Sequence, residues 1–408
     1  MHTLRVTTQE VPVSVGTPFH PRAAALNRKM QWREWSGYWA SSVYADFHDI
    51  EYNAIREAAA VIDVSPLYKY RITGPDALRL TDRVITRDAT KLKVGQVYYT
   101  PWCDEHGKVI DDGTVHRVGD QEIRWTAADP QYRWLTQNAA GLDVAIEDVS
   151  EALAALALQG PFSRAVLEAV TGESFADLRY FRRRASQVGG VDIDVSRTGY
   201  TGDLGYELWI PAEAAPDVWD RLFEVGKAWA IRPAGMLALD VTRLEAGLIL
   251  LEVDYTSARH AMNPEQNYSP FEIGLGKLVS FDKGDYVGRR ALLAEQAAGG
   301  PSRRIVGLQL DWYDIEGLYD DQGLPPAISP TTDRSSVPVF AEGHQVGKAT
   351  SHGWSPILKQ AIALASVPPR YERTGTRLQV EWTVEGRRGR VNATVVELPF
   401  LDLERKRA

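Results

Sequence analysis

The chain has 408 residues, a formal net charge of −8 and a hydrophobic fraction of 44%. This length predicts two or three domains, and the acidic balance excludes electrostatic binding of nucleic acid or an anionic membrane surface. The single cysteine, Cys103, excludes an internal disulfide framework, and the scattered histidines predict no metal site. We find no signal-peptide core and no membrane-length apolar stretch, so we expect a cytoplasmic protein.

The N-terminal region is rich in proline and then in aromatic residues. Residues 1–28 are expected to be irregular. Trp32, Trp35 and Trp39 then crowd together with Tyr38 and Tyr44. Large aromatic side chains usually fill a core. The alternative is an aromatic wall for a planar or a methylated cationic ligand.

The next segment alternates strands with helices. The pattern predicts helices at 46–60, 75–82 and 130–137, and strands at 62–65, 68–72, 96–99 and 122–126. It also predicts turns at 101–107 and 111–113, the second flanked by strand pieces at 108–110 and 114–117. Residues 66–150 are therefore expected to form one ferredoxin-like α+β domain.

The remainder separates into an α+β part and a β part. Helices are predicted at 160–170, 216–229, 234–247 and 289–297, and a strand at 191–195 has a returning partner at 208–210. A linker at 299–302 precedes strands at 305–310, 337–340, 362–367, 378–384 and 390–396. We expect 1–65 to join 151–280 in a discontinuous α+β domain. Residues 281–408 are expected to form a barrel-like β domain with a frayed tail at 404–407.

The most informative stretch is SRTGYTGDLGYELWI at 196–210. Its three glycines, spaced by three, exceed what a hairpin needs and indicate bare backbone lying close to another group. Tyr200 and Glu207 flank them, and a carboxylate accepts two parallel N–H bonds from an amidine-like edge, such as that of a pterin or a guanine. The alternative is an elaborate turn with a surface Tyr and Glu. No phosphate loop, dinucleotide fingerprint or nucleophile elbow is visible, which removes support for kinases, dehydrogenases and hydrolases.

Several short motifs occur in one order along residues 45–400. They are DVS at 63–65, QVYYT at 96–100, DEHGKVIDD at 104–112, the glycine loop, RLEAGL at 243–248, GLG at 274–276, FDK at 281–283, SPIL at 355–358, IALA at 362–365 and LPF at 398–400. Together they resemble the folate-dependent aminomethyltransferase family, whose type member is the T-protein of the glycine cleavage system.

The resemblance implies a three-domain α+β cloverleaf around tetrahydrofolate, with a C-terminal β domain. It assigns Glu207 to the amino edge of the pterin, Tyr200 to the cofactor and Arg243 to the acidic tail of the folate, the alternative for Arg243 being a helix salt bridge. It places Asp111 near the reacting nitrogen, where a buried carboxylate orients an amine or helps a proton move. The alternative for Asp111 is a turn residue. Tyr99 is a further catalytic candidate.

Two departures from the type member bear on the substrate. Leu239-Asp240 stands where that protein has Arg-Asp, and Pro66-Leu67 stands where it has His-Met. A lost cation and a richer aromatic cluster favour a free, methylated small molecule over a lipoyl-carrier substrate. The donor pocket is expected to be lined by four tryptophans, Trp32, Trp35, Trp39 and Trp102.

We therefore expect a tetrahydrofolate-dependent demethylase that moves a methyl group from an N-, O- or S-methyl donor to N5 of the folate. Three alternatives remain open. The first is aminomethyltransferase activity in the glycine cleavage system, and the second is a non-catalytic folate-binding protein of the iron–sulfur assembly type. The third is the folate domain of a flavin-linked oxidase, which requires a partner oxidoreductase. The sequence indicates no oligomeric state.

Overall fold

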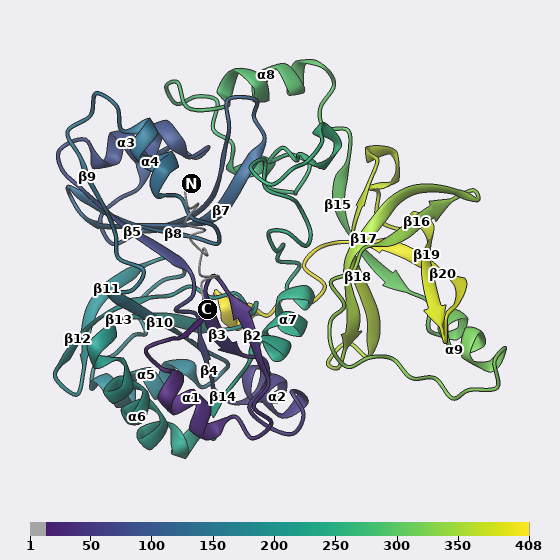
Figure 1. Ribbon diagram of the computed structural model, residues 1–408, viewed down its shortest axis with the longest axis horizontal. Coiled ribbons are helices and arrows are strands. Elements are labelled where there is room, and N and C mark those ends of the chain that lie inside the picture. The colour runs from purple at the N-terminus through teal and green to yellow at the C-terminus, as the bar shows by residue number, and fades with distance from the viewer. Residues whose placement is uncertain (1–13, 408) are drawn as a thin grey trace, which may run out of the picture.

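The computed structural model describes residues 14–407, so the expectation for residues 1–13 lies outside the described part. Two α+β lobes lie against each other, and a closed β-barrel lies to one side of them (Figure 1). This architecture confirms the expected α+β class with a C-terminal barrel. The residue boundaries between the domains stay a prediction.

The first lobe is built on a six-stranded sheet in the order β11-β12-β13-β10-β4-β14. Tyr206 and Leu208 point into a core under the helices on one face, and Glu207 and Trp209 alternate onto the other face. The strands are β4 (Ala60–Asp63), β10 (Leu153–Gln159), β11 (Arg183–Val188), β12 (Val191–Ser196), β13 (Gly205–Pro211) and β14 (Arg232–Pro233).

Helices cover both faces of this sheet. The first face carries α1 (His20–Leu26), α5 (Ser163–Thr171) and α6 (Ala215–Gly226), and the second carries α2 (Asp49–Glu57) and α7 (Met236–Glu245). Helix α1 shows that the expectation of irregular structure up to residue 28 is wrong. Pro21 lies in the first turn of α1, where its missing N–H has no helical partner to lose.

The second lobe carries a five-stranded sheet in the order β6-β7-β8-β5-β9, with α3 (Ala77–Val84) and α4 (Tyr132–Asn138) packed on it. Its strands are β5 (Tyr68–Thr73), β6 (Val97–Cys103), β7 (Val109–Gly119), β8 (Glu122–Ala127) and β9 (Ala145–Asp148). The predicted turn at 111–113 is wrong, because β7 is continuous through it. Gly113 serves a close approach instead: a Cβ there would lie 2.1 Å from the carbonyl oxygen of Thr126 on β8.

The aromatic cluster near the N-terminus is a small sheet of its own. It consists of β1 (Val15–Gly16), β2 (Trp32–Trp35) and β3 (Tyr38–Ser41), in the order β1-β3-β2. The turn between β2 and β3 reaches the second lobe, where the hydroxyl of Ser36 donates to the carbonyl of Ala128. This hairpin therefore lies against both lobes.

The barrel closes in the order β15-β18-β17-β16-β19-β20 and follows α8 (Arg289–Ala297). Its strands are β15 (Arg304–Leu310), β16 (Val337–Ala341), β17 (His344–Ser355), β18 (Gln360–Val367), β19 (Arg377–Val384) and β20 (Arg387–Val396). Strand β17 and helix α9 (Trp312–Asp320) were not predicted from the sequence. In the described part of the chain, no helix is both long and apolar enough to cross a membrane.

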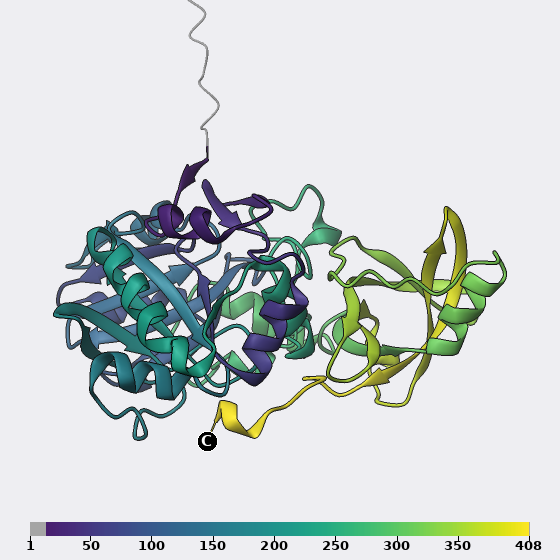
Figure 2. The same cartoon turned by 90° about the horizontal axis from the view of Figure 1, so that it is seen from below.

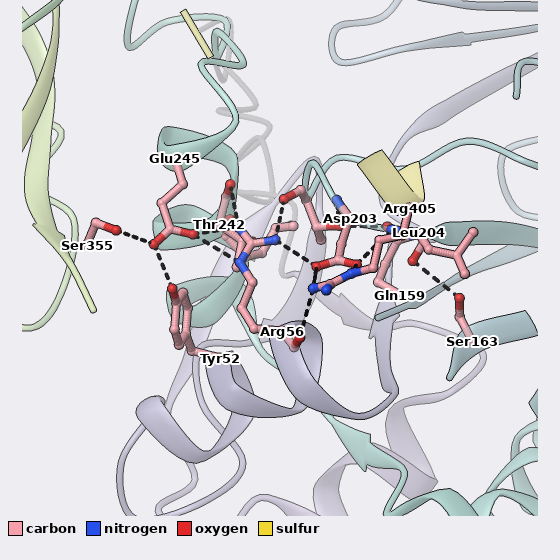
Figure 3. A network of polar contacts seen from close by, with 12 residues as sticks. Tyr52, Arg56, Gln159, Ser163, Asp203, Leu204, Thr242, Glu245, Ser355 and Arg405 are labelled. Atoms are coloured by element: carbon pink, nitrogen blue, oxygen red, sulfur yellow. Dashed lines mark hydrogen bonds and ion pairs between the residues drawn. The ribbon is translucent and has the colours of Figure 1, made fainter. Parts of the chain in front are cut away.

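A buried ionic network joins the first lobe to the barrel and to the C-terminal tail (Figure 3). Arg56 forms ion pairs with Glu245 at 2.6 Å and with Asp203 at 3.2 Å. Glu245 also accepts hydrogen bonds from Tyr52 and from Ser355 on β17. Arg405 reaches Asp203 from the tail, which returns beneath the first lobe (Figure 2). The tail is therefore docked, and the expectation that it frays is wrong.

Candidate functional site

The glycine loop wraps around a side chain of its own protein. A Cβ on Gly199 or Gly205 would lie 2.2 or 2.3 Å from the amide group of Gln159 on β10. The amide of Gln159 accepts from Thr201 and donates to the carbonyl of Thr198. Gly199 and Gly205 thus permit internal packing, and the loop sets the position of the side chains on either side of it.

Glu207 lies on the face of the sheet that is turned away from α5 and α6. It pairs with Ser196 on β12, and its Oε2 accepts a 2.5 Å hydrogen bond from the hydroxyl of Thr198. Among the described residues no donor reaches Oε1. Burial raises the pKa of Glu207, while Thr198 and the charge of Arg124 oppose that shift. A partly buried carboxylate with one unpartnered oxygen suits a ligand that presents N–H donors.

Tyr200 packs against an apolar cluster of the first lobe. Its hydroxyl donates to the carbonyl of Ile249, and Trp35 and Met236 pack against the same cluster, which contains Leu239. Burial raises the pKa of Tyr200, and the negative charge of Asp112 adds to the shift. Tyr200 of the first lobe is therefore close enough to Asp112 of the second lobe for their charges to interact.

Asp112 on β7 is held by two phenols. The hydroxyl of Tyr99 donates to its Oδ2 at 2.6 Å, and the hydroxyl of Tyr255 donates to its Oδ1. Burial raises the pKa of Asp112, and both phenol hydrogen bonds oppose the shift. An oriented carboxylate with a raised pKa is suited to accepting or holding a proton.

Comparison with known proteins places the chain in a family. The model for the GCVT N-terminal domain matches residues 19–283, and the model for the glycine cleavage T-protein C-terminal barrel domain matches residues 325–402. The chain belongs to the aminomethyltransferase family. Members of this family are tetrahydrofolate-dependent one-carbon transferases, which confirms the resemblance drawn from the motifs.

Two curated relatives and one solved structure illustrate the match. The chain is 36% identical to aminomethyltransferase from Moorella thermoacetica, over 94% of this chain and 97% of that protein. It is 35% identical to trimethylamine-oxide aldolase from Ruegeria pomeroyi, over 96% of this chain but only 47% of that protein, so it spans about half of that relative. The structure of aminomethyltransferase from Bartonella henselae has a TM-score of 0.80 at 24% identity, over 95% of this chain and 98% of that one, which shows the fold.

The carboxylate of Glu207 and the ring of Tyr200 fit tetrahydrofolate, the cofactor of the family. The free oxygen of Glu207 offers an acceptor to the amino edge of a reduced pterin, and Tyr200 offers an aromatic ring. The assignment of both residues to the cofactor stays a prediction.

Asp111, the catalytic candidate from the sequence, is placed differently. Its carboxylate is fully buried and points away from Asp112, because neighbouring residues on a strand face opposite sides. It accepts hydrogen bonds from the backbone N–H groups of Asp112, Ala128 and Asp129 and from the side chain of Gln131. Burial raises the pKa of Asp111. With these four donors around it, Asp111 acts as an anchor for the loop after β8.

Arg243, predicted to reach the acidic tail of the folate, is only 1% exposed. Its guanidinium donates to Asp240 at 2.8 Å, to Asp254 at 2.8 Å and to Ser351 on β17 at 2.8 Å. Each of its three nitrogens is engaged within the protein. The sequence also left open a salt bridge at the helix as the role of Arg243. The structure shows such ion pairs with Asp240 and Asp254.

The four tryptophans predicted to line the donor pocket do not lie together. Trp102 is fully buried in the core of the second lobe, where its indole N–H donates to Gln131. Trp32 packs beside His20 on the face of the first lobe that carries α1, α5 and α6, and Trp39 is 38% exposed. Only Trp35 packs in the cluster that contains Tyr200, so it alone stays a candidate for the donor pocket.

Sequence reasoning missed Tyr255 and Arg124. Tyr255 lies in an irregular segment after α7, where no periodicity marks it as a partner of Asp112. Arg124 comes from β8 of the second lobe, pairs with Asp194 at 2.6 Å and lies 4.3 Å from the centre of the Trp209 ring. Both act across segments that are distant in sequence, and no local pattern predicts such contacts.

Proposed function

We propose that this protein is a tetrahydrofolate-dependent demethylase that takes a one-carbon unit from a small methylated molecule. The observation that carries the proposal is the apolar cluster of Trp35, Tyr200 and Leu239 beside Asp112. Leu239 stands where the type member has an arginine, so an apolar side chain replaces a cation beside the candidate site. An aromatic and aliphatic wall favours methylated groups.

A relative supports the choice of substrate class. The name trimethylamine-oxide aldolase describes a protein that acts on a methylated amine oxide, and this chain matches about half of that protein. Bound tetrahydrofolate would supply the ring nitrogen that accepts the one-carbon unit. Glu207 would bind the amino edge of the cofactor, and Tyr200 would lie against it.

Asp112 has the role that we first assigned to Asp111. Tyr99 and Tyr255 fix both oxygens of its carboxylate, so the group keeps one orientation without help from a ligand. We propose that Asp112 accepts or holds a proton at Oδ while the one-carbon unit moves. Holding donor and acceptor beside each other supplies much of the rate enhancement in such a reaction.

The second candidate is aminomethyltransferase activity in the glycine cleavage system, favoured by the relatives that carry that name. A single-turnover assay with tetrahydrofolate and isotope-labelled methyl donors separates the two. 5-Methyltetrahydrofolate is the product expected of the demethylase. Formation of 5,10-methylenetetrahydrofolate alone, with activity on a lipoylated carrier, would establish the second candidate instead.

A further inference from the structure

Arg33 on β2 is a partly buried cation without a protein partner. Within residues 14–407, no hydrogen bond or ion pair joins its guanidinium to another group, although most buried or half-buried arginines here are paired. The fold places a second cation beside it. Burial lowers the pKa of Arg33, the charge of Arg334 lowers it further, and Asp240 opposes them.

The backbone places Arg33 next to the start of α7. Arg33 pairs with Ala40 on β3, and just after β3 the carbonyl of Ser42 accepts a 3.0 Å hydrogen bond from the N–H of Leu237. One turn further along α7, Asp240 accepts a 2.7 Å hydrogen bond from Arg334. Arg243 also binds Asp240, so the single carboxylate is already shared by two arginines and leaves Arg33 uncompensated.

Arg33 shares a face of its strand with Trp35. Residues two apart on a strand point to the same side, about 6–7 Å from each other. Glu34 lies on the other face, where it accepts from the N–H of Gly37. Because Trp35 packs in the cluster with Tyr200 and Leu239, the face that carries Arg33 is the face turned to the candidate site.

We propose that Arg33, supported by Arg334, binds a carboxylate group of a ligand in the candidate site. Arg33 and Arg334 are neighbouring guanidiniums, and the carboxylate beside them, Asp240, already binds Arg334 and Arg243. The excess positive charge at this place favours binding of an anion. A planar guanidinium binds a carboxylate through two parallel hydrogen bonds. This inference rests on the proposed function and adds a recognised group to it. That group is a carboxylate, which either the substrate or the glutamate tail of the folate presents.

The spacing favours a particular kind of substrate. A carboxylate on Arg33 leaves a methylated nitrogen, one or two bonds away, near the ring of Trp35. An N-methylated amino acid has both groups at this separation, and its ammonium is attracted by an aromatic face. Leu239 removes the cation that would otherwise repel that ammonium.

Calorimetric binding to the full-length protein tests the proposal with two matched pairs of probes. The first pair is tetrahydrofolate and tetrahydropteroate, which lacks the glutamate. The second is dimethylglycine and trimethylamine N-oxide, which lacks a carboxylate. Arg33→Gln is expected to weaken binding of the carboxylate-bearing member of one pair by about tenfold or more and to leave its partner unchanged. The affected pair identifies the source of the carboxylate.

Two control variants accompany the test. Arg28→Gln removes an exposed arginine five residues away and is expected to change no affinity. Arg33→Lys keeps the charge but not the two-pronged geometry, and is expected to recover part of the lost affinity. Thermal unfolding of each variant checks the fold.

Three results would overturn the proposal: unchanged binding of both carboxylate probes to Arg33→Gln, an equal loss for both members of a pair, or no binding of either carboxylate probe to the wild-type protein. Wild-type protein that binds dimethylglycine through Arg33 but transfers no one-carbon unit would overturn the proposed function and leave this inference standing.

Discussion

The hydroxyl of Tyr99 on β6 donates a 2.6 Å hydrogen bond to Oδ2 of Asp112 on the neighbouring strand β7. With Tyr255 on the other oxygen, both sides of the carboxylate are fixed. Asp111, the residue before it, is also surrounded by donors, but these are mainly backbone groups of the loop after β8. Two adjacent aspartates thus have different surroundings, and substitutions separate their roles.

Asp112→Asn is expected to abolish most one-carbon transfer while leaving the fold intact, since the group is partly exposed to the site. Asp111→Asn replaces a buried acceptor of four hydrogen bonds and is expected to lower the free energy of unfolding by about 1–3 kcal/mol. Urea unfolding and single-turnover transfer measure the two effects. A stable, inactive Asp111→Asn protein would reverse our assignment.

Removing either phenol is expected to move the pH profile of the reaction. Each O–H···O bond stabilises the ionised form of Asp112 and so lowers its pKa. Tyr99→Phe or Tyr255→Phe is therefore expected to raise that pKa and to shift the acid limb of kcat/KM to higher pH. Tyr98→Phe is the control, because the ring of Tyr98 lies under the guanidinium of Arg87. An acid limb that stays in place in both variants argues against proton transfer at Asp112.

Glu207→Ala is expected to weaken binding of tetrahydrofolate by about 1.5–3 kcal/mol, because it removes a charged acceptor from the N–H groups of the ligand. Glu213→Gln, at an exposed position just after β13, serves as a control that keeps wild-type affinity. Calorimetry with tetrahydrofolate gives both values. Equal affinity in Glu207→Ala and wild type would remove Glu207 from the site.

The buried network around Arg56 is expected to dominate the coupling between the first lobe and the barrel. Glu245→Gln leaves the guanidinium of Arg56 with a weakened partner and is expected to cost about 3–5 kcal/mol of unfolding free energy. Asp220→Asn breaks the exposed pair with Arg22 and is expected to leave stability nearly unchanged, because solvent screens that pair. Chemical unfolding compares the two variants. Similar small losses in both would show that the buried network contributes little.

Sequence patterns predicted the periodic elements well and the packing of single residues poorly. The strand at 191–195 and the helix at 234–247 correspond to β12 and α7, because alternation and helical spacing are local properties. Gly113 looked like a turn residue, yet it serves the approach of β8, which no local pattern encodes. The burial of Trp102 and Arg243 likewise depends on partners distant in sequence.

A β-bulge in the pairing of β6 with β7 lies next to the two aspartates. Trp102 pairs with Asp111, but Cys103 pairs with Val109, so Ile110 is an extra residue in this ladder. Side chains alternate along a strand, and a slip of one position exchanges the two faces. Deleting Ile110 would remove this bulge but leave Trp102 opposite Asp111, so both acids would keep their present faces. Alternation along this one strand sets which acid faces the phenols of Tyr99 and Tyr255.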